Sequence, residues 1–511
     1  MLTNLKALLV LLPIAFAVFS LLRPLCLKFM SDADFRLRRN LWFTLTCVAF
    51  LSPSFWLFAL AAIPLIGSTA AKDKNPVALY LLLLQVIPPF GLQLPVVGIN
   101  QLFELNSYRI LAFALLIPAL FRLSRQRDKR KSSSHRSMDY FILAYAVLQI
   151  VLLMPNESIT NTLRRAFLFS IDTLALYFAA SRLCRNRRDI EEALACFCLA
   201  CAIYAPLAVF ESLRGWQLYG GLREQWTAVE DIAFSYLLRG ETLRALVSAG
   251  HPLALGYMMS MAFGFWLYLQ SRVGSITVTW LGAGVFWAGL LGAYSRGPWL
   301  VAALVFFVFI SLGPQGASRF VKAVISAAII GALVLVSPIG ERVIDNLPFI
   351  GTVDSENVSY RQRFAEISWQ LIQANPLFGD SNILLYLEDL RQGQGIVDFI
   401  NSYATIAMYY GLVGLFLFLG PYLSGMWKMF VLRRRLAMVN PEAANLGTAL
   451  LACMTGTLFM MATGSFGTSL EKLYYVLAGL AAAYLQAGVP EPLSQLAMPG
   501  AEPRRRLGLT Q

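Results

Sequence analysis

The residues most able to do chemistry in this chain are arginines that accompany long apolar runs. Arg244 and Arg296 lie close to such runs, and Arg361 and Arg363 lie in a polar segment that separates two of them. An arginine inside a membrane costs about 2.5–3.5 kcal/mol, so its retention there indicates a function. The guanidinium stays charged at any relevant pH and binds two phosphate oxygens at once. These arginines are therefore candidate ligands for a phosphate or diphosphate group.

Arg296 has the most informative setting. It lies in the sequence Tyr294-Ser295-Arg296-Gly297-Pro298-Trp299, between an apolar run of helical length and the next apolar run. Gly297 permits a tight turn, and Pro298 suits the first position of the following helix. This geometry places Arg296 at a helix N-terminus, where the helix dipole already favours anions.

Membrane helices are the elements that must position these arginines. The chain has 511 residues, of which 58% are hydrophobic and 14% charged, and its mean hydropathy is +0.62. A soluble protein has about 25% charged residues. Apolar runs of about 17–25 residues, long enough to cross a bilayer, predict an all-α polytopic membrane protein with 13 or 14 transmembrane helices. The expected spans are 5–22, 41–66, 105–121, 138–154, 166–181, 191–210, 250–270, 275–294, 298–312, 322–338, 403–424, 446–464 and 473–487, with 77–90 as a further candidate.

The net charge of +13 is concentrated in short loops between these spans. Loops at 122–136, 182–188 and 433–435 carry most of it, which is the pattern of cytoplasmic loops in a membrane protein. We therefore expect no nucleic-acid partner. With these loops in the cytoplasm, the segments 155–165, 211–249, 294–297, 339–402 and 465–472 face the extracytoplasmic side.

The first hundred residues leave two topologies open. The loop 23–40 carries Arg23, Lys28, Arg36, Arg38 and Arg39, which favours the cytoplasm. That placement requires 77–90 to be re-entrant and the N-terminus to lie outside. If 77–90 spans instead, the N-terminus lies inside and the basic loop 23–40 breaks the rule.

The metal-ligating residues give no sign of a metal or cofactor site. The chain has two histidines and seven cysteines, and Cys196, Cys198 and Cys201 lie within one apolar span. Carboxylates and histidines that usually complete a metal site are missing around them. We expect these cysteines to pack in the core, and we expect no metal and no cofactor.

A motif near the C-terminus resembles the signature of a known family. Asn401-Ser402 is followed, after eight residues, by Gly411-Leu412-Val413-Gly414. This resembles the O-antigen ligase and polymerase superfamily, in which His-Asn/Ser/Gln is followed nine residues later by Gly-x-x-Gly. The position of the family's histidine is held by Ile400.

Two further segments are similar to that family. Arg244-Ala245, followed by His251-Pro252 and Gly256, resembles the family's entry into a membrane helix, although Leu253 stands where asparagine is common. The segment 360–379 resembles the family's loop helix, with Trp369 and Gly379 at matching positions. Such a helix would lie at the lipid interface and cover a cavity. Arg361 and Arg363 are two residues apart, so one is expected to face the cavity and the other the solvent.

The resemblance implies a C-class glycosyltransferase (GT-C) fold with a large extracytoplasmic loop between late helices. The expected divisions are N-terminal helices 1–190, the ligase-like core 191–338, the periplasmic loop 339–402, C-terminal helices 403–487 and a cytoplasmic tail 488–511. Family members use an undecaprenyl-diphosphate-linked glycan as donor. By this resemblance Arg296 and Arg244 contact the diphosphate, and Arg361, Arg363 and Asn401 contact substrate. Asn401 is equally able to cap the following helix.

The missing histidine affects the predicted reaction. In family ligases the histidine before asparagine is the general base, a role that Ile400 cannot fill. Asp398 is a candidate substitute, as are Asp354, Glu356 and Glu366, and His251 is a further catalytic candidate. We therefore predict a metal-independent polysaccharide polymerase that transfers a lipid-linked glycan onto another lipid-linked repeat unit. A chain-length regulator and a flippase are candidate partners. The alternatives are a ligase that acts on a lipid or protein acceptor, and a lipid-glycan transporter, although internal repeats typical of transporters are not evident.

Overall fold

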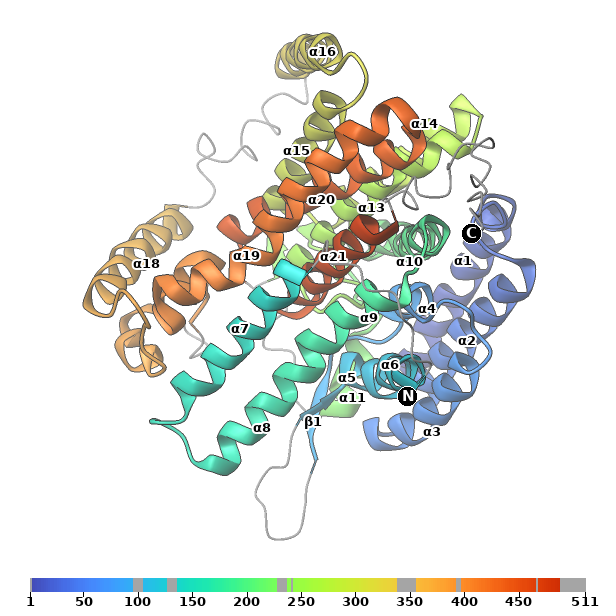
Figure 1. Cartoon of the computed structure of the whole chain (residues 1–511). Helices are drawn as coiled ribbons and strands as arrows, with labels where there is room; N and C mark the ends of the chain where they lie inside the picture. Colours follow the sequence, from blue (N-terminus) through green and yellow to red (C-terminus); the bar gives the residue numbers. More distant parts are fainter. Residues whose placement is uncertain are drawn as a thin grey trace, which may run out of the picture.

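The computed structural model of the chain is a bundle of α-helices (Figure 1). It describes residues 2–94, 104–125, 136–227, 237–239, 242–337, 355–391, 397–465 and 467–487. Within these ranges, nine helices are long and apolar enough to cross a membrane, and three shorter apolar helices accompany them. The all-α polytopic membrane class predicted from hydropathy is confirmed. The predicted tail 488–511 and parts of the loop 339–402 lie outside the described residues.

The N-terminal half consists of helices and one small pair of β-strands. Its elements are α1 (Leu2–Cys26), α2 (Asp32–Leu51), α3 (Phe55–Ala70), α4 (Pro76–Leu83), β1 (Gly91–Gln93), β2 (Glu104–Asn106), α5 (Ser107–Leu111), η1 (Ala112–Leu116), α6 (Ile117–Arg125), α7 (Arg136–Leu153), α8 (Ile159–Phe169), η2 (Ser170–Leu174), α9 (Ala175–Leu183), α10 (Arg187–Arg214) and α11 (Gly220–Thr227). Strands β1 and β2 pair antiparallel. The π-helical turns η1 and η2 join their neighbours into the longer helices Ser107–Arg125 and Ile159–Leu183.

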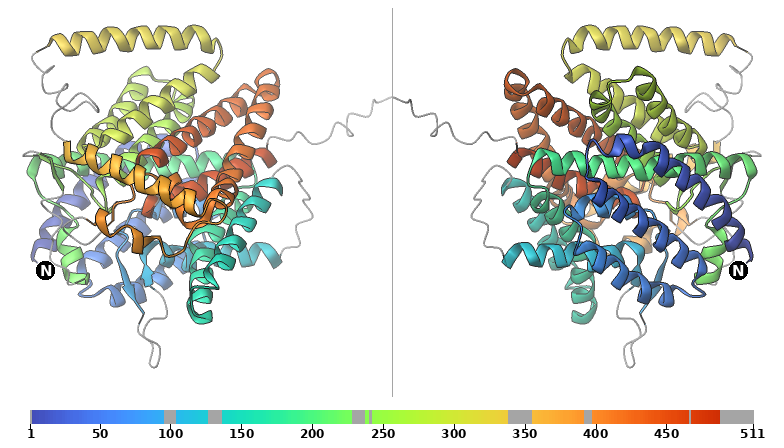
Figure 2. Two further views of the ribbon diagram at one scale, coloured as in Figure 1. Left: turned by 90° about the vertical axis from the view of Figure 1, so that its left-hand side faces the viewer. Right: turned by 90° about the vertical axis from the view of Figure 1, so that its right-hand side faces the viewer.

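The C-terminal half contains the segments that the arginine pattern singled out. Its elements are β3 (Leu238–Arg239), β4 (Thr242–Leu243), α13 (Pro252–Leu269), η3 (Gln270–Arg272), α14 (Ile276–Gly292), α15 (Arg296–Leu312), α16 (Gly316–Val336), α18 (Ser355–Ala374), η5 (Ile383–Tyr386), η6 (Glu388–Leu390), α19 (Ser402–Val439), α20 (Pro441–Thr463) and α21 (Thr468–Ala487). Figure 2 shows α18 on the outside of the bundle and α16 set apart from the other helices.

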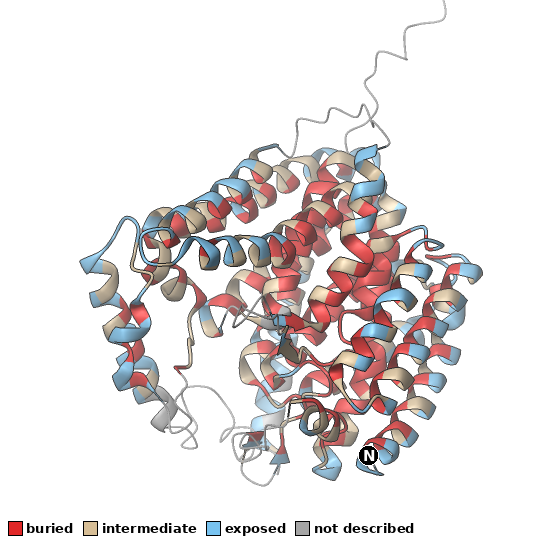
Figure 3. Cartoon of the chain, turned by 90° about the horizontal axis from the view of Figure 1, so that it is seen from below, coloured by how far each residue is buried: buried red, intermediate tan, exposed pale blue. Residues whose placement is uncertain are grey.

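The buried residues gather in the middle of the bundle (Figure 3), and α10, α13 and α20 consist mostly of buried residues. Small residues let these helices approach closely, as is usual where apolar lipid gives no driving force for association. Gly289 and Gly292 of α14 lie against Ala205 and Ala208 of α10. These contacts fix α14, and with it the turn that leads to Arg296.

Contacts between distant segments define two ends of the bundle. At the end that we call the basic end, the Lys28 side chain donates to the Arg272 carbonyl at 3.0 Å, and Arg272 pairs with Glu442. At the end that we call the site end, Asn4 donates to Gln225 at 2.6 Å, and Gln225 donates to the Ser52 carbonyl at 3.0 Å. The N-terminus therefore lies at the site end, and the basic loop after α1 lies at the basic end.

One predicted span was wrong, and this changes how the first hundred residues run through the bundle. The run 41–66 is two helices, α2 and α3, because Ser52-Pro53-Ser54 interrupts the helix at the site end and Ser54 caps α3. Helix α4 has eight residues and a length of about 12 Å, too short for a spanning helix. The segment 76–90 nevertheless runs from the basic end to the site end, where the Gln85 carbonyl accepts from Ser248. Because 41–66 is two helices, the loop 23–40 and the start of the segment 76–90 both lie at the basic end.

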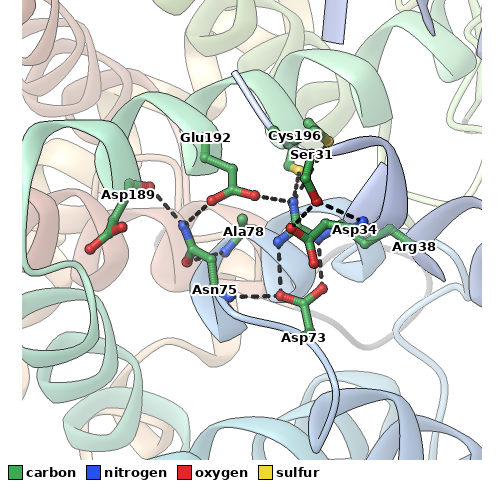
Figure 4. Close-up of polar contacts among 10 residues, drawn as sticks. Ser31, Asp34, Arg38, Asp73, Asn75, Ala78, Asp189, Glu192 and Cys196 are labelled. Atoms are coloured by element: carbon green, nitrogen blue, oxygen red, sulfur yellow. Dashed lines mark hydrogen bonds and ion pairs between the residues drawn. The ribbon is translucent and has the colours of Figure 1, made fainter. Parts of the chain in front are cut away.

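A buried ion cluster ties α2, α4 and α10 together at the basic end (Figure 4). The Arg38 side chain is 1% exposed and binds both carboxylate oxygens of Asp73, at 2.7 and 2.8 Å. Its Nη1 also donates to Glu192 at 2.7 Å, and Asn75 donates to the other oxygen of Glu192 at 3.1 Å. A buried charge is tolerated only when it is paired and hydrogen-bonded in this way. Arg38 is therefore a structural residue of the basic end.

Candidate functional site

The turn before α15 gathers three arginines at the site end. Tyr294 has a φ of +45°, a left-handed conformation that reverses the chain between α14 and α15. The buried Ser295 hydroxyl accepts from Arg244 at 2.8 Å. Arg239 donates to the Tyr294 carbonyl at 3.4 Å, and its guanidinium lies 5.9 Å from the centre of the Tyr294 ring. We call Arg239, Arg244 and Arg296, with this turn, the arginine turn.

A buried carboxylate holds the arginine turn in place. Glu211, near the end of α10, is fully buried and accepts from three backbone amides, those of Leu218, Leu246 and Val247, at 2.8, 3.1 and 2.8 Å. The neighbouring Ala245 amide donates to the Gly292 carbonyl at 3.0 Å. The segment that carries Arg244 is therefore pinned to both α10 and the end of α14. Rigid support of this kind preorganises a binding site.

His251 lies beside Arg244 and begins α13. Its Nδ1 accepts from the Leu253 amide at 3.1 Å, so the side chain is the N-cap of the helix. Burial, together with the nearby positive charge of Arg244, lowers the pKa of His251 to about 4. The imidazole is neutral near pH 7, and with Nδ1 accepting from the backbone its proton is on Nε2. This arrangement makes His251 a hydrogen-bond donor and leaves Nδ1 committed to the helix.

Three helix N-termini meet next to the arginine turn. Gly297 of α15 lies against Leu253 of α13 and against Thr463 at the end of α20. The Ser402 hydroxyl, at the start of α19, donates to the Gly464 carbonyl at 2.7 Å. The N-termini of α13, α15 and α19 therefore surround the end of α20. Because each N-terminus carries a partial positive charge, their convergence beside three arginines creates a strongly anion-attracting region.

A cleft of about 280 Å³ lies between the α20 end and α18. We call it the α18 cleft. Among its lining residues are Arg361, Ser368, Trp369, Ile400, Asn401 and Ala462. The side-chain oxygen of Asn401 accepts from the backbone amides of Tyr403 and Ala404, at 3.0 and 3.1 Å, and so caps α19. Since that oxygen faces the helix, the side-chain NH2 is the group that Asn401 offers to a ligand.

Asp398 lies at the edge of this region. Its backbone amide and carbonyl both bond to the Tyr360 hydroxyl, at 3.0 and 2.9 Å, which fixes it against α18. Burial raises the pKa of Asp398, while the positive charge of Arg361 opposes that rise. A carboxylate in this setting is a stronger base than an exposed one, which suits it to general-base chemistry.

The Gly-x-x-Gly motif has a structural explanation. Helix α19 is broken at Gly411, where φ is +67° and ψ is −173°. The segment 376–380 fills the break. The Asp380 backbone amide donates to the Met408 carbonyl at 2.8 Å, and the amides of Leu412 and Val413 donate to the Pro376 and Leu377 carbonyls at 2.8 and 3.2 Å. Backbone freed within a membrane helix must be satisfied by protein. We call this contact the helix-break junction; it anchors the end of α18 over the cleft.

The structure divides the predicted site residues into two groups. Arg244, Arg296 and His251 lie at the arginine turn, whereas Arg361, Asp398 and Asn401 lie at the α18 cleft. Arg363 is exposed and does not line the cleft. Sequence reasoning missed the role of Glu211. The only signal for Glu211 was its position as an acidic residue at the end of an apolar run.

Comparison with known families agrees with this geometry. Residues 258–419 match the O-antigen ligase family, a stretch that runs from the first turns of α13 into α19 and contains Arg296, Arg361, Asp398 and Asn401. No curated protein matches the chain. The resemblance recognised from the motifs is confirmed. The chain is a multi-pass membrane protein whose segment 258–419 matches the O-antigen ligase family.

Proposed function

We propose that this protein is a polysaccharide polymerase of the bacterial inner membrane. It transfers an undecaprenyl-diphosphate-linked glycan onto another lipid-linked repeat unit at the periplasmic face. The observation that carries the proposal is the arginine turn beside three helix N-termini. Arg244 is held by Ser295 at 2.8 Å, so its guanidinium is oriented before substrate arrives.

The arginine turn binds the diphosphate of the donor in this proposal. Breaking the anomeric bond leaves a lipid diphosphate, and its developing negative charge needs fixed positive charge nearby. Arg244 and Arg296 supply that charge, and the N-terminus of α15 adds its dipole. His251 contributes Nε2–H as a donor to a phosphate or sugar oxygen.

Asp398 acts as the general base in place of the family's histidine. The acceptor hydroxyl attacks the anomeric carbon of the donor glycan and forms a new glycosidic bond. The bond from that carbon to the diphosphate oxygen breaks, and its electron pair leaves with the lipid diphosphate. The hydroxyl proton passes to Asp398, whose raised pKa favours its acceptance. Ile400 lines the cleft without a titratable group.

The orientation follows from the two ends of the bundle. The basic end carries Arg38, Arg187, Arg272 and Arg433 and faces the cytoplasm by the positive-inside rule. The site end then faces the periplasm. A flippase has to bring the lipid-linked unit to that side, and a chain-length regulator is a partner consistent with polymerisation.

A ligase that passes the glycan to a lipid or protein acceptor is the second candidate, because the same diphosphate site serves both reactions. Ile400 favours the polymerase, since family ligases use histidine there. A transporter is disfavoured by the helix-break junction. Transporters use the broken ends of membrane helices to hold substrate, whereas the break at Gly411 is occupied by the chain's own segment 376–380.

Arg296→Ala tests the diphosphate site. In proteoliposomes supplied with lipid-linked repeat unit, we expect the variant to insert normally and to form no product. Arg214→Ala is the matched control, because Arg214 is an exposed arginine at the same end of the bundle, outside the arginine turn. Wild-type product levels in Arg296→Ala would refute the proposed role.

A further inference from the structure

The α18 cleft contains a serine whose placement needs an explanation. Ser368 lies in the middle of α18, is 2% exposed and lines the cleft. Within the part of the chain that the structure describes, its hydroxyl has no hydrogen-bond partner. Buried polar groups without partners are rare, and each one calls for a reason.

Four other buried hydroxyls in these helices show the usual arrangement. A serine or threonine inside a helix ordinarily donates to the carbonyl four residues earlier. Thr46, Ser260, Thr448 and Thr457 all make this bond, at 2.9, 2.9, 3.0 and 2.9 Å. Ser368 makes no bond to its own helix and borders the cleft, which is the arrangement expected of a group that awaits a ligand.

The surrounding groups indicate the chemistry of that ligand. Arg361 lies two turns earlier on the same face of α18, and Asn401, whose side-chain oxygen caps α19, also lines the cleft. Both are hydrogen-bond donors, whereas a hydroxyl both donates and accepts. Trp369 also lines the cleft and is 62% exposed. A sugar ring carries hydroxyls around its edge and C–H groups on its faces, so it matches polar groups combined with an aromatic surface.

The position of the cleft indicates that it binds the acceptor glycan rather than the donor. The arginine turn meets the α20 end at Thr463, which lies against Gly297, and the cleft meets it at the neighbouring Ala462. Asp398 lies close to Arg361 of the cleft. A sugar in the α18 cleft would therefore present a hydroxyl to the base, beside the site of the diphosphate.

We propose that the α18 cleft binds one sugar of the acceptor glycan and that Ser368 hydrogen-bonds a hydroxyl of that sugar. Ser368 is then a specificity-determining residue for the acceptor. This inference rests on the proposed glycan transfer and assigns one part of its substrate to one cleft.

The test uses the repeat-unit oligosaccharide released from its lipid and phosphate, bound to the full-length protein in nanodiscs. This probe bypasses the diphosphate site, so Arg296→Ala should bind it as the wild type does even though transfer is lost. We expect Ser368→Ala to weaken binding about tenfold, the value of one hydrogen bond to a buried partner. Ser170→Ala is the matched control, because the Ser170 hydroxyl already donates to the Ala166 carbonyl at 2.8 Å.

A labelling experiment covers the case in which Ser368→Ala alters the fold. In a Cys47→Ser background, which removes the one partly exposed native cysteine, Ser368→Cys should react with a small polar thiol reagent, and the oligosaccharide should slow that reaction. Equal labelling with and without oligosaccharide, or wild-type binding by Ser368→Ala, would overturn the proposal. So would protection by a short prenyl alcohol in place of the sugar, which would assign the cleft to a lipid chain. Loss of transfer with sugar binding intact would refute only the proposed function.

Discussion

Gly411→Ala should release the helix-break junction. At φ +67° and ψ −173°, Gly411 has a backbone conformation that is essentially restricted to glycine. A Cβ at this position would lie 2.1 Å from the Leu377 carbonyl oxygen, which is backbone and cannot rotate away. The substitution is therefore incompatible with the docked position of the segment 376–380.

The magnitude follows from what the junction contains. Three backbone hydrogen bonds join the segment to α19, and each contributes about 0.5–1.5 kcal/mol. The backbone strain of a non-glycine residue adds about 1–3 kcal/mol. A loss of about 3 kcal/mol corresponds to roughly a hundredfold increase in opening of the junction.

Hydrogen–deuterium exchange measures this opening directly. In Gly411→Ala, the amides of Asp380, Leu412 and Val413 should exchange about a hundred times faster than in the wild type, because opening is raised by that factor. Gly284→Ala is the matched control, since Gly284 lies within α14 and a Cβ there meets nothing within 4 Å. Unchanged exchange at the three amides would refute the account of the Gly-x-x-Gly motif.

Three further predictions concern single side chains. Asp398→Asn should lower transfer by about 10²–10⁴-fold. Because burial raises the pKa of Asp398, wild-type activity should fall as the pH drops through that raised pKa. If the variant still lost activity over the same acidic pH range, its pH–rate profile would contradict the role of Asp398 as base. Arg38→Met leaves the carboxylates of Asp73 and Glu192 without their partner and should cost about 3–5 kcal/mol, which an unchanged thermal midpoint in detergent would disprove. His251→Asn should preserve stability because asparagine also caps helices, whereas His251→Ala should lose about 1 kcal/mol; equal thermal midpoints for both variants would exclude the capping role.

Hydropathy and charge patterning predicted most of the helices and grouped the site residues on one face. That succeeds because membrane helices must be apolar throughout and because basic loops orient them. The same reasoning failed at 41–66, because Ser52-Pro53-Ser54 changes the mean hydropathy of a long window very little. The sequence does contain the local signal, since serine is a common helix N-cap and Ser54 caps α3.

The parts of the site that escaped prediction depend on distant contacts. The Gly411 break is stable only because the segment 376–380 supplies hydrogen bonds from outside α19. Glu211 is acceptable as a buried carboxylate only because three amides from two later segments converge on it. Local patterns indicate residue types that suit such positions, but they do not show which segments meet there.

Reconstitution with the donor tests the central claim most directly. The purified protein is placed in liposomes with undecaprenyl-diphosphate-linked repeat unit, and the glycan is resolved by length while free lipid diphosphate is quantified. The account predicts a ladder of multiples of the repeat, with one lipid diphosphate released per bond formed. A donor that stays unextended and keeps its diphosphate linkage, with or without movement across the bilayer, would contradict it.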